Sequence, residues 1–259
     1  MRVTDVATQP AEAKAAPRRR SLRVRPAPWT GLVIGSVVLL LAATVFLTAA
    51  WAATRTTSST SFTAIVPDTL LRIELQVAEG DVEILGGVSP DVLVNRTDSS
   101  VFGHSPEERR MIENGVLRFE SSCPQLVVGS CAADYQLTVP ENVPLAIVTE
   151  HGDVRLTAYR GSARLSTNGG DITVEAFCGS LLDATAKGGD IAVTATCPPG
   201  RMTLLTTSGD VDARVPPGRY SVDVKTISGR ATIGAADEPG AAHRIQVLSN
   251  SGDVTVAVG

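Results

Sequence analysis

The stretch Thr206–Val215, TTSGDVDARV, contains a glycine–aspartate pair followed by a segment in which apolar and polar residues alternate. The arrangement recurs at Ser166–Ala176 (STNGGDITVEA), Ala184–Ala195 (ATAKGGDIAVTA) and Ser249–Val258 (SNSGDVTVAV). We take the residue after each such glycine as position zero, which gives Asp153, Asp171, Asp190, Asp210, Arg230 and Asp253. Their spacings are 18, 19, 20, 20 and 23 residues, and a repeat near 20 residues is typical of solenoid proteins.

Each repeat contains two segments that alternate with a period of two. The first, third and fifth residues after position zero are apolar in every copy, as are the residues eight and six positions before it. This period indicates a strand with one buried face, and turn glycines such as Gly200 separate the strands. An earlier copy around Asp81 reads LRIELQVAEGDVEILGG. We therefore predict an all-β fold: a parallel β-helix-like β-solenoid with two strands per coil of about 20 residues, preceded by one transmembrane helix.

The aspartates at position zero should form a column along one edge of the solenoid: Asp81, Asp153, Asp171, Asp190, Asp210 and Asp253. We interpret them as turn formers at a repeated corner. The alternative is a cation site, because stacked carboxylates repel each other and calcium could relieve the repulsion. Calcium-binding repeats, however, have a nine-residue period and denser glycine. We predict no metal site, cofactor or catalytic residue.

Four cysteines fit two disulfides. Cys178 and Cys197 each lie seven residues after position zero in adjacent copies, so stacked coils would bring them within disulfide range. Cys123 and Cys131 flank a short loop between two strand-like segments. Disulfides persist in exported proteins, and we predict the pairs Cys123–Cys131 and Cys178–Cys197; free thiols are the alternative.

The segment Gly31–Ala50 consists of twenty uncharged, mostly apolar residues, enough for a helix to cross a bilayer. Residues 1–29 contain seven basic residues against two acidic ones, so the tail carries a net charge of +5 and the remainder −9. The positive-inside rule then places the N-terminus in the cytoplasm and the C-terminal domain outside. A cleaved signal peptide is the alternative, but the apolar segment is longer than is usual for one.

We divide the chain into a basic cytoplasmic tail (1–29), a transmembrane helix (30–53), a polar linker (54–65) and an extracytoplasmic solenoid domain (66–259). Residues 91–142 are strand-like but less regular, and we expect them to form a cap or a variant coil.

Units of the form T-x-(S/G)-G-D-(V/I), such as Thr206–Val211, and the segment YQLTVPENVPL (Tyr135–Leu145) resemble the bacterial "putative adhesin" family, a domain of unknown function with β-strand repeats. The resemblance covers roughly Val66–Gly259. It implies an exported or membrane-anchored protein and brings no catalytic residues with it. Arg230 departs from the pattern, which argues against a strict role for every aspartate.

The acidic exported part argues against a nucleic-acid partner. We expect a non-enzymatic, membrane-anchored surface module that binds cell-wall glycan, a surface protein or its own copies. An envelope-stress signalling accessory is the alternative. A glycan-active enzyme is a further alternative, because parallel β-helices can carry carboxylates on an outer face; the outward candidates are Asp183, Asp212, Asp223, Arg164 and Lys225.

Overall fold

The computed structural model describes residues 28–53, 55–64, 70–101, 105–124 and 130–259. It divides into two units, Met1–Ala50 and Trp51–Gly259. Of the predicted basic tail (1–29), residues 1–27 lie outside the described residues, and the helix already begins at Pro28.

One helix, α1 (Pro28–Ala53), covers the predicted transmembrane segment and begins two residues before it. Its stretch Gly35–Ala52 has a mean hydropathy of 2.0, and none of this stretch is buried in the protein. The helix is therefore long and apolar enough to cross a membrane, a property that an anchor and a signal sequence share.

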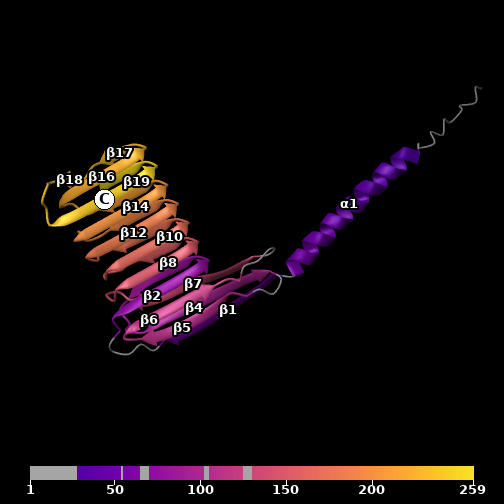
Figure 1. The fold of residues 1–259 in the computed structure, drawn as a ribbon, viewed down its shortest axis with the longest axis horizontal. Coiled ribbons are helices and arrows are strands. Elements are labelled where there is room, and N and C mark those ends of the chain that lie inside the picture. Colours follow the sequence, from indigo (N-terminus) through magenta and orange to yellow (C-terminus); the bar gives the residue numbers. More distant parts are fainter. Residues whose placement is uncertain (1–27, 54, 65–69, 102–104, 125–129) are drawn as a thin grey trace, which may run out of the picture. The chain divides into compact units, whose positions relative to one another are not determined.

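The rest of the described chain folds into two ten-stranded sheets (Figure 1). The first sheet contains, in spatial order, β1 (Arg55–Ala64), β4 (Val92–Val101), β7 (Cys131–Pro140), β3 (Val82–Gly87), β9 (Val154–Thr157), β11 (Ile172–Phe177), β13 (Ile191–Ala195), β15 (Val211–Val215), β20 (Val254–Val258) and β17 (Ala231–Ile233). The second sheet contains β18 (Ala236–Asp237), β16 (Arg219–Ser228), β19 (His243–Ser251), β14 (Arg201–Ser208), β12 (Leu181–Gly188), β10 (Ala163–Gly169), β8 (Leu145–His151), β2 (Arg72–Glu79), β6 (Val116–Ser122) and β5 (Glu107–Glu113).

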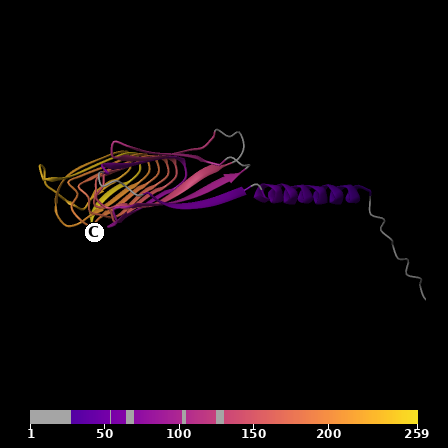
Figure 2. The same ribbon diagram turned by 90° about the horizontal axis from the view of Figure 1, so that it is seen from below.

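A coil consists of one strand from each sheet, and successive coils overlie one another as flattened loops (Figure 2). Equivalent apolar positions pair in register along the stack: Leu165 is the partner of Ile147 on one side and of Ala184 on the other. The core between the sheets is therefore a set of columns of small aliphatic side chains. The solenoid-like architecture agrees with the two strands per repeat predicted from the sequence.

The coils do not stack in the order of the sequence at either end. The C-terminal coil, β19–β20, lies between β14–β15 and β16–β17, so that β16–β17 ends the stack (Figure 1). At the other end, β6–β7 lies outside β2–β3, although it follows that coil in the chain. Residues 91–142 thus supply a variant coil, β6–β7, together with the antiparallel strands β4 and β5.

The prediction of a polar linker at residues 54–65 was wrong. Residues 55–64 form β1, which pairs antiparallel with β4 along its whole length, from Arg55↔Val101 to Ala64↔Val92. The physical reason is the presence of four threonines and Phe62 in this segment, because β-branched and aromatic residues favour strands.

A bulge changes which side chains are buried in two coils. Ala158 and Ala176, expected on the buried face, adopt left-handed conformations with φ of 54° and 53°. Ala176 is exposed, and the next residues, Tyr159 and Phe177, enter the core with no exposed surface. The bulge allows an aromatic ring to fill the corner where aliphatic side chains would leave space.

We predict that the corner glycines are indispensable. A Cβ added to Gly189, whose φ is 142°, would lie 2.0 Å from the carbonyl oxygen of Gly170. Gly189→Ala should lower the free energy of unfolding by about 3 kcal/mol or more, through backbone strain and the clash. The neighbouring Gly188 has only Asn168 O at 3.8 Å, so Gly188→Ala should change stability little. Chemical denaturation of the full chain in detergent compares the two variants. Equal losses of stability in Gly189→Ala and Gly188→Ala would contradict the requirement for glycine at the corner.

Candidate functional site: a groove across five strands

The corner aspartates form a ladder of hydrogen bonds between coils. The main-chain N–H of Asp171 donates to Oδ1 of Asp153 at 2.8 Å, and the N–H of Asp190 donates to Oδ1 of Asp171 at 2.8 Å. In all, the ladder contains seven such bonds of 2.7–3.0 Å, whose acceptors in spatial order are Asp134, Asp81, Asp153, Asp171, Asp190, Asp210 and Asp253. Each carboxylate thus stabilises the corner of the next coil.

The remaining motif residues bind the same corner. Thr206 donates its hydroxyl hydrogen to the carbonyl of Gly189 at 3.1 Å, and Ser249 donates to that of Gly209 at 3.2 Å. Arg230 occupies the last corner of the stack, where its N–H donates to Asp253, and among the described strands no further coil follows that would require an acceptor. The exception in the sequence therefore marks the end of the ladder.

Carboxylates in this column are committed to backbone groups. Within the described residues, no group of three or more histidine, cysteine, aspartate or glutamate side chains is placed to hold a metal ion. The outward candidates for a glycan-active site pair locally instead: Arg164 with Asp183 at 3.4 Å, and Lys225 with Asp223 at 3.6 Å. Asp212 pairs with Arg214 at 3.1 Å.

A groove of about 600 Å³ lies on the outer face of the first sheet, across β1, β4, β7, β3 and β9. One row of its lining is polar and runs from strand to strand in register. Ser61 Oγ donates to Asn95 Oδ1 at 3.3 Å, and Asn95 Nδ2 donates to Gln136 Oε1 at 3.2 Å. Gln136 Nε2 donates in turn to Glu83 Oε2 at 3.3 Å. We call Ser61, Asn95, Gln136 and Glu83 the amide row.

The second row alternates hydroxyl and leucine side chains. The pairing Thr63↔Leu93, Leu93↔Thr138, Thr138↔Leu85 and Leu85↔Thr157 places one residue from each of the five strands in line. Leu85 and Leu93 are 46% and 47% exposed, whereas the leucines that face the core, such as Leu75 and Leu156, have no exposed surface. At a strand spacing of about 4.8 Å, five strands give the row a length of about 19 Å. We call these five residues the leucine row.

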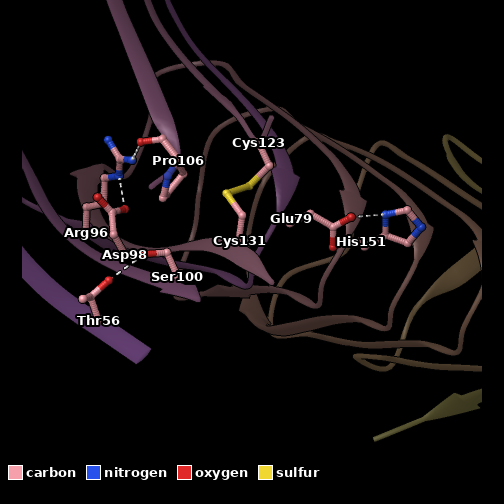
Figure 3. Close-up of a disulfide and its surroundings, with 9 residues drawn as sticks. All are labelled: Thr56, Glu79, Arg96, Asp98, Ser100, Pro106, Cys123, Cys131 and His151. Atoms are coloured by element: carbon pink, nitrogen blue, oxygen red, sulfur yellow. Dashed lines mark hydrogen bonds and ion pairs between the residues drawn. A yellow bond between two sulfur atoms is a disulfide. The ribbon is translucent and has the colours of Figure 1, made fainter. Parts of the chain in front are cut away.

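A buried arginine holds the strand that carries Asn95 and Leu93. The side chain of Arg96 is 6% exposed, and its guanidinium contacts Glu108 at 2.8 Å. It also contacts Asp98 at 2.6 Å, and its third nitrogen donates to the Pro106 carbonyl at 3.0 Å (Figure 3). Burial raises the pKa of the Asp98 carboxyl, although the charge of Arg96 acts in the opposite direction. The cluster ties β4 to the beginning of β5.

Two further links hold the strands of the groove. The disulfide Cys123–Cys131 connects the end of β6, in the second sheet, to the start of β7, in the first (Figure 3). The hydroxyls of Thr56 and Ser100 are 2.7 Å apart and join β1 to β4.

The second disulfide, Cys178–Cys197, lies outside the groove and joins adjacent coils with a Cα–Cα distance of 4.6 Å. Both pairs are those predicted from the sequence.

The sequence did not indicate the groove. Ser61 and Thr63 fell within the predicted linker, and Leu93, Asn95 and Gln136 within the less regular region. The available signal was the β-branched, strand-favouring composition of residues 55–64. The pairing of this segment with β4 joins residues that are 28–46 positions apart in the chain, which the repeat period does not reveal.

The model of the family described as Toastrack DUF4097 matches residues 68–257, which is most of the chain and nearly all of the strand-forming unit. The chain belongs to the Toastrack DUF4097 family. No curated protein matches it significantly in sequence.

Solved structures that resemble this Toastrack chain include a "putative cell adhesion protein" from Clostridium sporogenes, at 10% identity and a TM-score of 0.47, covering 78% of this chain and 100% of that one. A "putative adhesin" from Bacteroides fragilis has 13% identity and a TM-score of 0.44, covering 78% and 97%. A "putative lipid binding protein" from Parabacteroides distasonis has 11% identity and a TM-score of 0.38, covering 76% and 96%. These descriptions concern those proteins.

The ladder predicts a graded response at Asp190. Asp190→Ala removes the acceptor for the N–H of Asp210 and should cost about 1 kcal/mol, because water replaces part of the lost bond. Asp190→Asn keeps a side-chain oxygen and should lie closer to wild type. Arg230→Ala is the matched control at a corner whose side chain accepts no such bond, and it should be nearly neutral. Denaturation midpoints measure all three; a neutral Asp190→Ala would refute the ladder's role.

We also predict a large effect at Arg96. Arg96→Met leaves the Asp98 carboxylate without its cation, whereas Glu108 keeps its pair with Arg110 at 3.1 Å. The substitution should cost about 3 kcal/mol. The deficit should shrink as the pH falls, because protonation removes the unpaired charge of Asp98, a carboxyl whose pKa burial already raises. Arg214→Met breaks the exposed pair with Asp212 and should cost less than about 1 kcal/mol. Denaturation curves at several pH values test both predictions. Equal losses of stability in Arg96→Met and Arg214→Met would contradict the role of the buried Arg96 pair.

Proposed function

We propose that the chain is a membrane-anchored, non-enzymatic interaction module that binds envelope glycan in the groove of the first sheet. The observation that carries the proposal is the pair of parallel rows, amide and leucine, running in register across neighbouring strands. A linear polymer can lie across strands and meet the same two kinds of side chain at successive positions.

The chemistry of the rows suits a saccharide. Sugar hydroxyls both donate and accept hydrogen bonds, and the side-chain amides of Asn95 and Gln136 do the same. The C–H faces of a sugar ring are apolar and can pack on Leu85 and Leu93. The two rows cross five neighbouring strands over about 19 Å, which favours an extended ligand.

Binding without catalysis fits the lining. The carboxylate among its residues is Glu83, which accepts a hydrogen bond from Gln136 at 3.3 Å. Glycoside hydrolysis in most families requires two carboxyl groups separated by roughly 5–9.5 Å on either side of the scissile bond. The groove is therefore better suited to holding a glycan than to cleaving it.

Display on the outer side of a membrane is part of the proposal. The apolar helix α1 supplies an anchor, and β1 begins two residues after it in the sequence. Two disulfides support an oxidising compartment for the strand-forming unit. The basic residues that precede the helix support a cytoplasmic N-terminus.

The test is co-sedimentation of the full chain, in nanodiscs, with purified peptidoglycan sacculi. Leu93→Asp places a charge within the leucine row and should reduce binding about tenfold, because a carboxylate is costly to desolvate against sugar. Asn95→Ala removes one of the two side-chain amides of the amide row and should weaken binding severalfold, by about 1 kcal/mol.

The control is Thr194→Asp, on β13 of the same sheet and exposed, but outside the groove. It introduces the same charge and should leave binding unchanged. Absence of saturable binding by the wild type would sink the proposal for this glycan. Equal losses for Leu93→Asp and Thr194→Asp would show charge repulsion without a defined site.

A further inference from the structure

Two arginines lie side by side on the outer face of the second sheet. Arg201 of β14 and Arg244 of β19 are direct partners in the parallel pairing of these strands, and both are exposed. Met202 and Ile245, which follow them, have no exposed surface, so the alternation of the strands directs both arginine side chains away from the core. Neighbouring strands are about 4.8 Å apart, which brings the two positive charges close together.

The pair results from the order in which the coils stack. The strand β16 follows β14 in the repeat, and sequential stacking would place Ser221, the residue equivalent to Arg201, beside that arginine. Because β19 lies between β14 and β16 (Figure 1), Arg244 takes this place and Ser221 lies next to Arg244 instead. The two arginines are therefore brought together by the fold and not by the repeat.

Neither arginine has an ion-pair partner among the residues that the structure describes. Other arginines of this face contact carboxylates: Arg118 contacts Glu74 at 2.6 Å, and Arg164 contacts Asp183 at 3.4 Å. Like charges placed opposite each other on neighbouring strands destabilise a sheet. An anion held between the two guanidiniums would remove this repulsion, so the arrangement favours a negatively charged ligand.

The next residues along both strands add neutral polar groups. Thr203 and Gln246 are partners in the same pairing, two residues further on the same face, and they offer a hydroxyl and an amide. The residues that flank them on the neighbouring strands are Asp183 and Asp223. Each of these carboxylates already contacts a cation, at 3.4 and 3.6 Å. The two arginines therefore remain the positive centre of the patch.

We propose that Arg201 and Arg244 form a binding site for a phosphate monoester. A guanidinium offers two parallel N–H groups to an anion, and one such fork already satisfies both oxygens of a carboxylate. A phosphate monoester has three terminal oxygens and about two negative charges near neutral pH, which match two forks. The headgroup of a phosphatidic acid lipid and a soluble phosphate ester share this chemistry.

The test is a titration of the full chain, in a nonionic detergent, with glycerol phosphate. A ligand that binds the folded chain raises the thermal unfolding midpoint, and calorimetry gives the dissociation constant. Arg201→Gln and Arg244→Gln should each raise that constant about tenfold, because each removes a charge-assisted contact. Arg201→Lys keeps the charge but loses the fork, and it should weaken binding by a smaller factor.

The matched control is Arg155→Gln, on β9 of the first sheet. Arg155 is also exposed and has no ion-pair partner within the described ranges, so the substitution changes the net charge equally and should leave phosphate binding unchanged. Absence of saturable binding by the wild type, or an equal loss in Arg155→Gln, would overturn the proposal. Unfolding midpoints without ligand confirm that every variant remains folded.

A second experiment distinguishes the two sources of the ligand. The full chain in nanodiscs of neutral lipid is mixed with vesicles that contain phosphatidic acid, and flotation measures binding. Flotation that Arg244→Gln abolishes would assign the site to a lipid headgroup. Binding of glycerol phosphate without flotation would assign it to a soluble ester. The pair lies on the second sheet and the groove on the first, so glycan binding is an independent readout.

Discussion

The fold depends on one interaction, the hydrogen bond that joins successive corners. At each corner the backbone of one coil approaches the next so closely that an added Cβ would lie 2.0–2.2 Å from the facing glycine carbonyl in the regular coils. The N–H at position zero faces the preceding coil and needs an acceptor there, which the aspartate provides. Glycine, aspartate and the threonine or serine hydroxyl are therefore three parts of one joint, and the motif recurs because every joint has the same geometry.

The same joint sets the order of the coils. All repeats carry interchangeable apolar patterns, so packing alone does not decide whether Arg230 or Asp253 comes last. A coil stacked beyond Arg230 would find no carboxylate for its corner N–H, whereas a coil stacked beyond Asp210 finds one. The structure places Asp253 on Asp210 and Arg230 on Asp253, which satisfies every acceptor requirement. The column of like charges is tolerated because each carboxylate faces an N–H dipole.

The difference between contacts that repeat from coil to coil and contacts that occur once explains what could be predicted from the sequence. The strands, their register and the pair Cys178–Cys197 follow from the period, because equivalent positions in adjacent repeats must stack. The order of the terminal coils, the strand at residues 55–64 and the groove do not, because they result from pairings between segments that share no repeat. The bulges at Ala158 and Ala176 were missed because alanine fits the apolar pattern, while the aromatic residue that follows it is what the core requires.

The two ends of the stack are protected from further strand pairing in different ways. Beyond the coil β6–β7, the antiparallel strands β1, β4 and β5 extend the sheets, and the residues of β5 are mostly charged, which discourages further pairing. At the other end, β18 pairs with Arg219 and Tyr220 of β16, and the carboxylate of Asp237 accepts a hydrogen bond from the N–H of Val222. The chain therefore covers the first half of this edge with its own residues. Arg230 acts at the same end, because a corner without a carboxylate offers no acceptor to the corner N–H of a further coil.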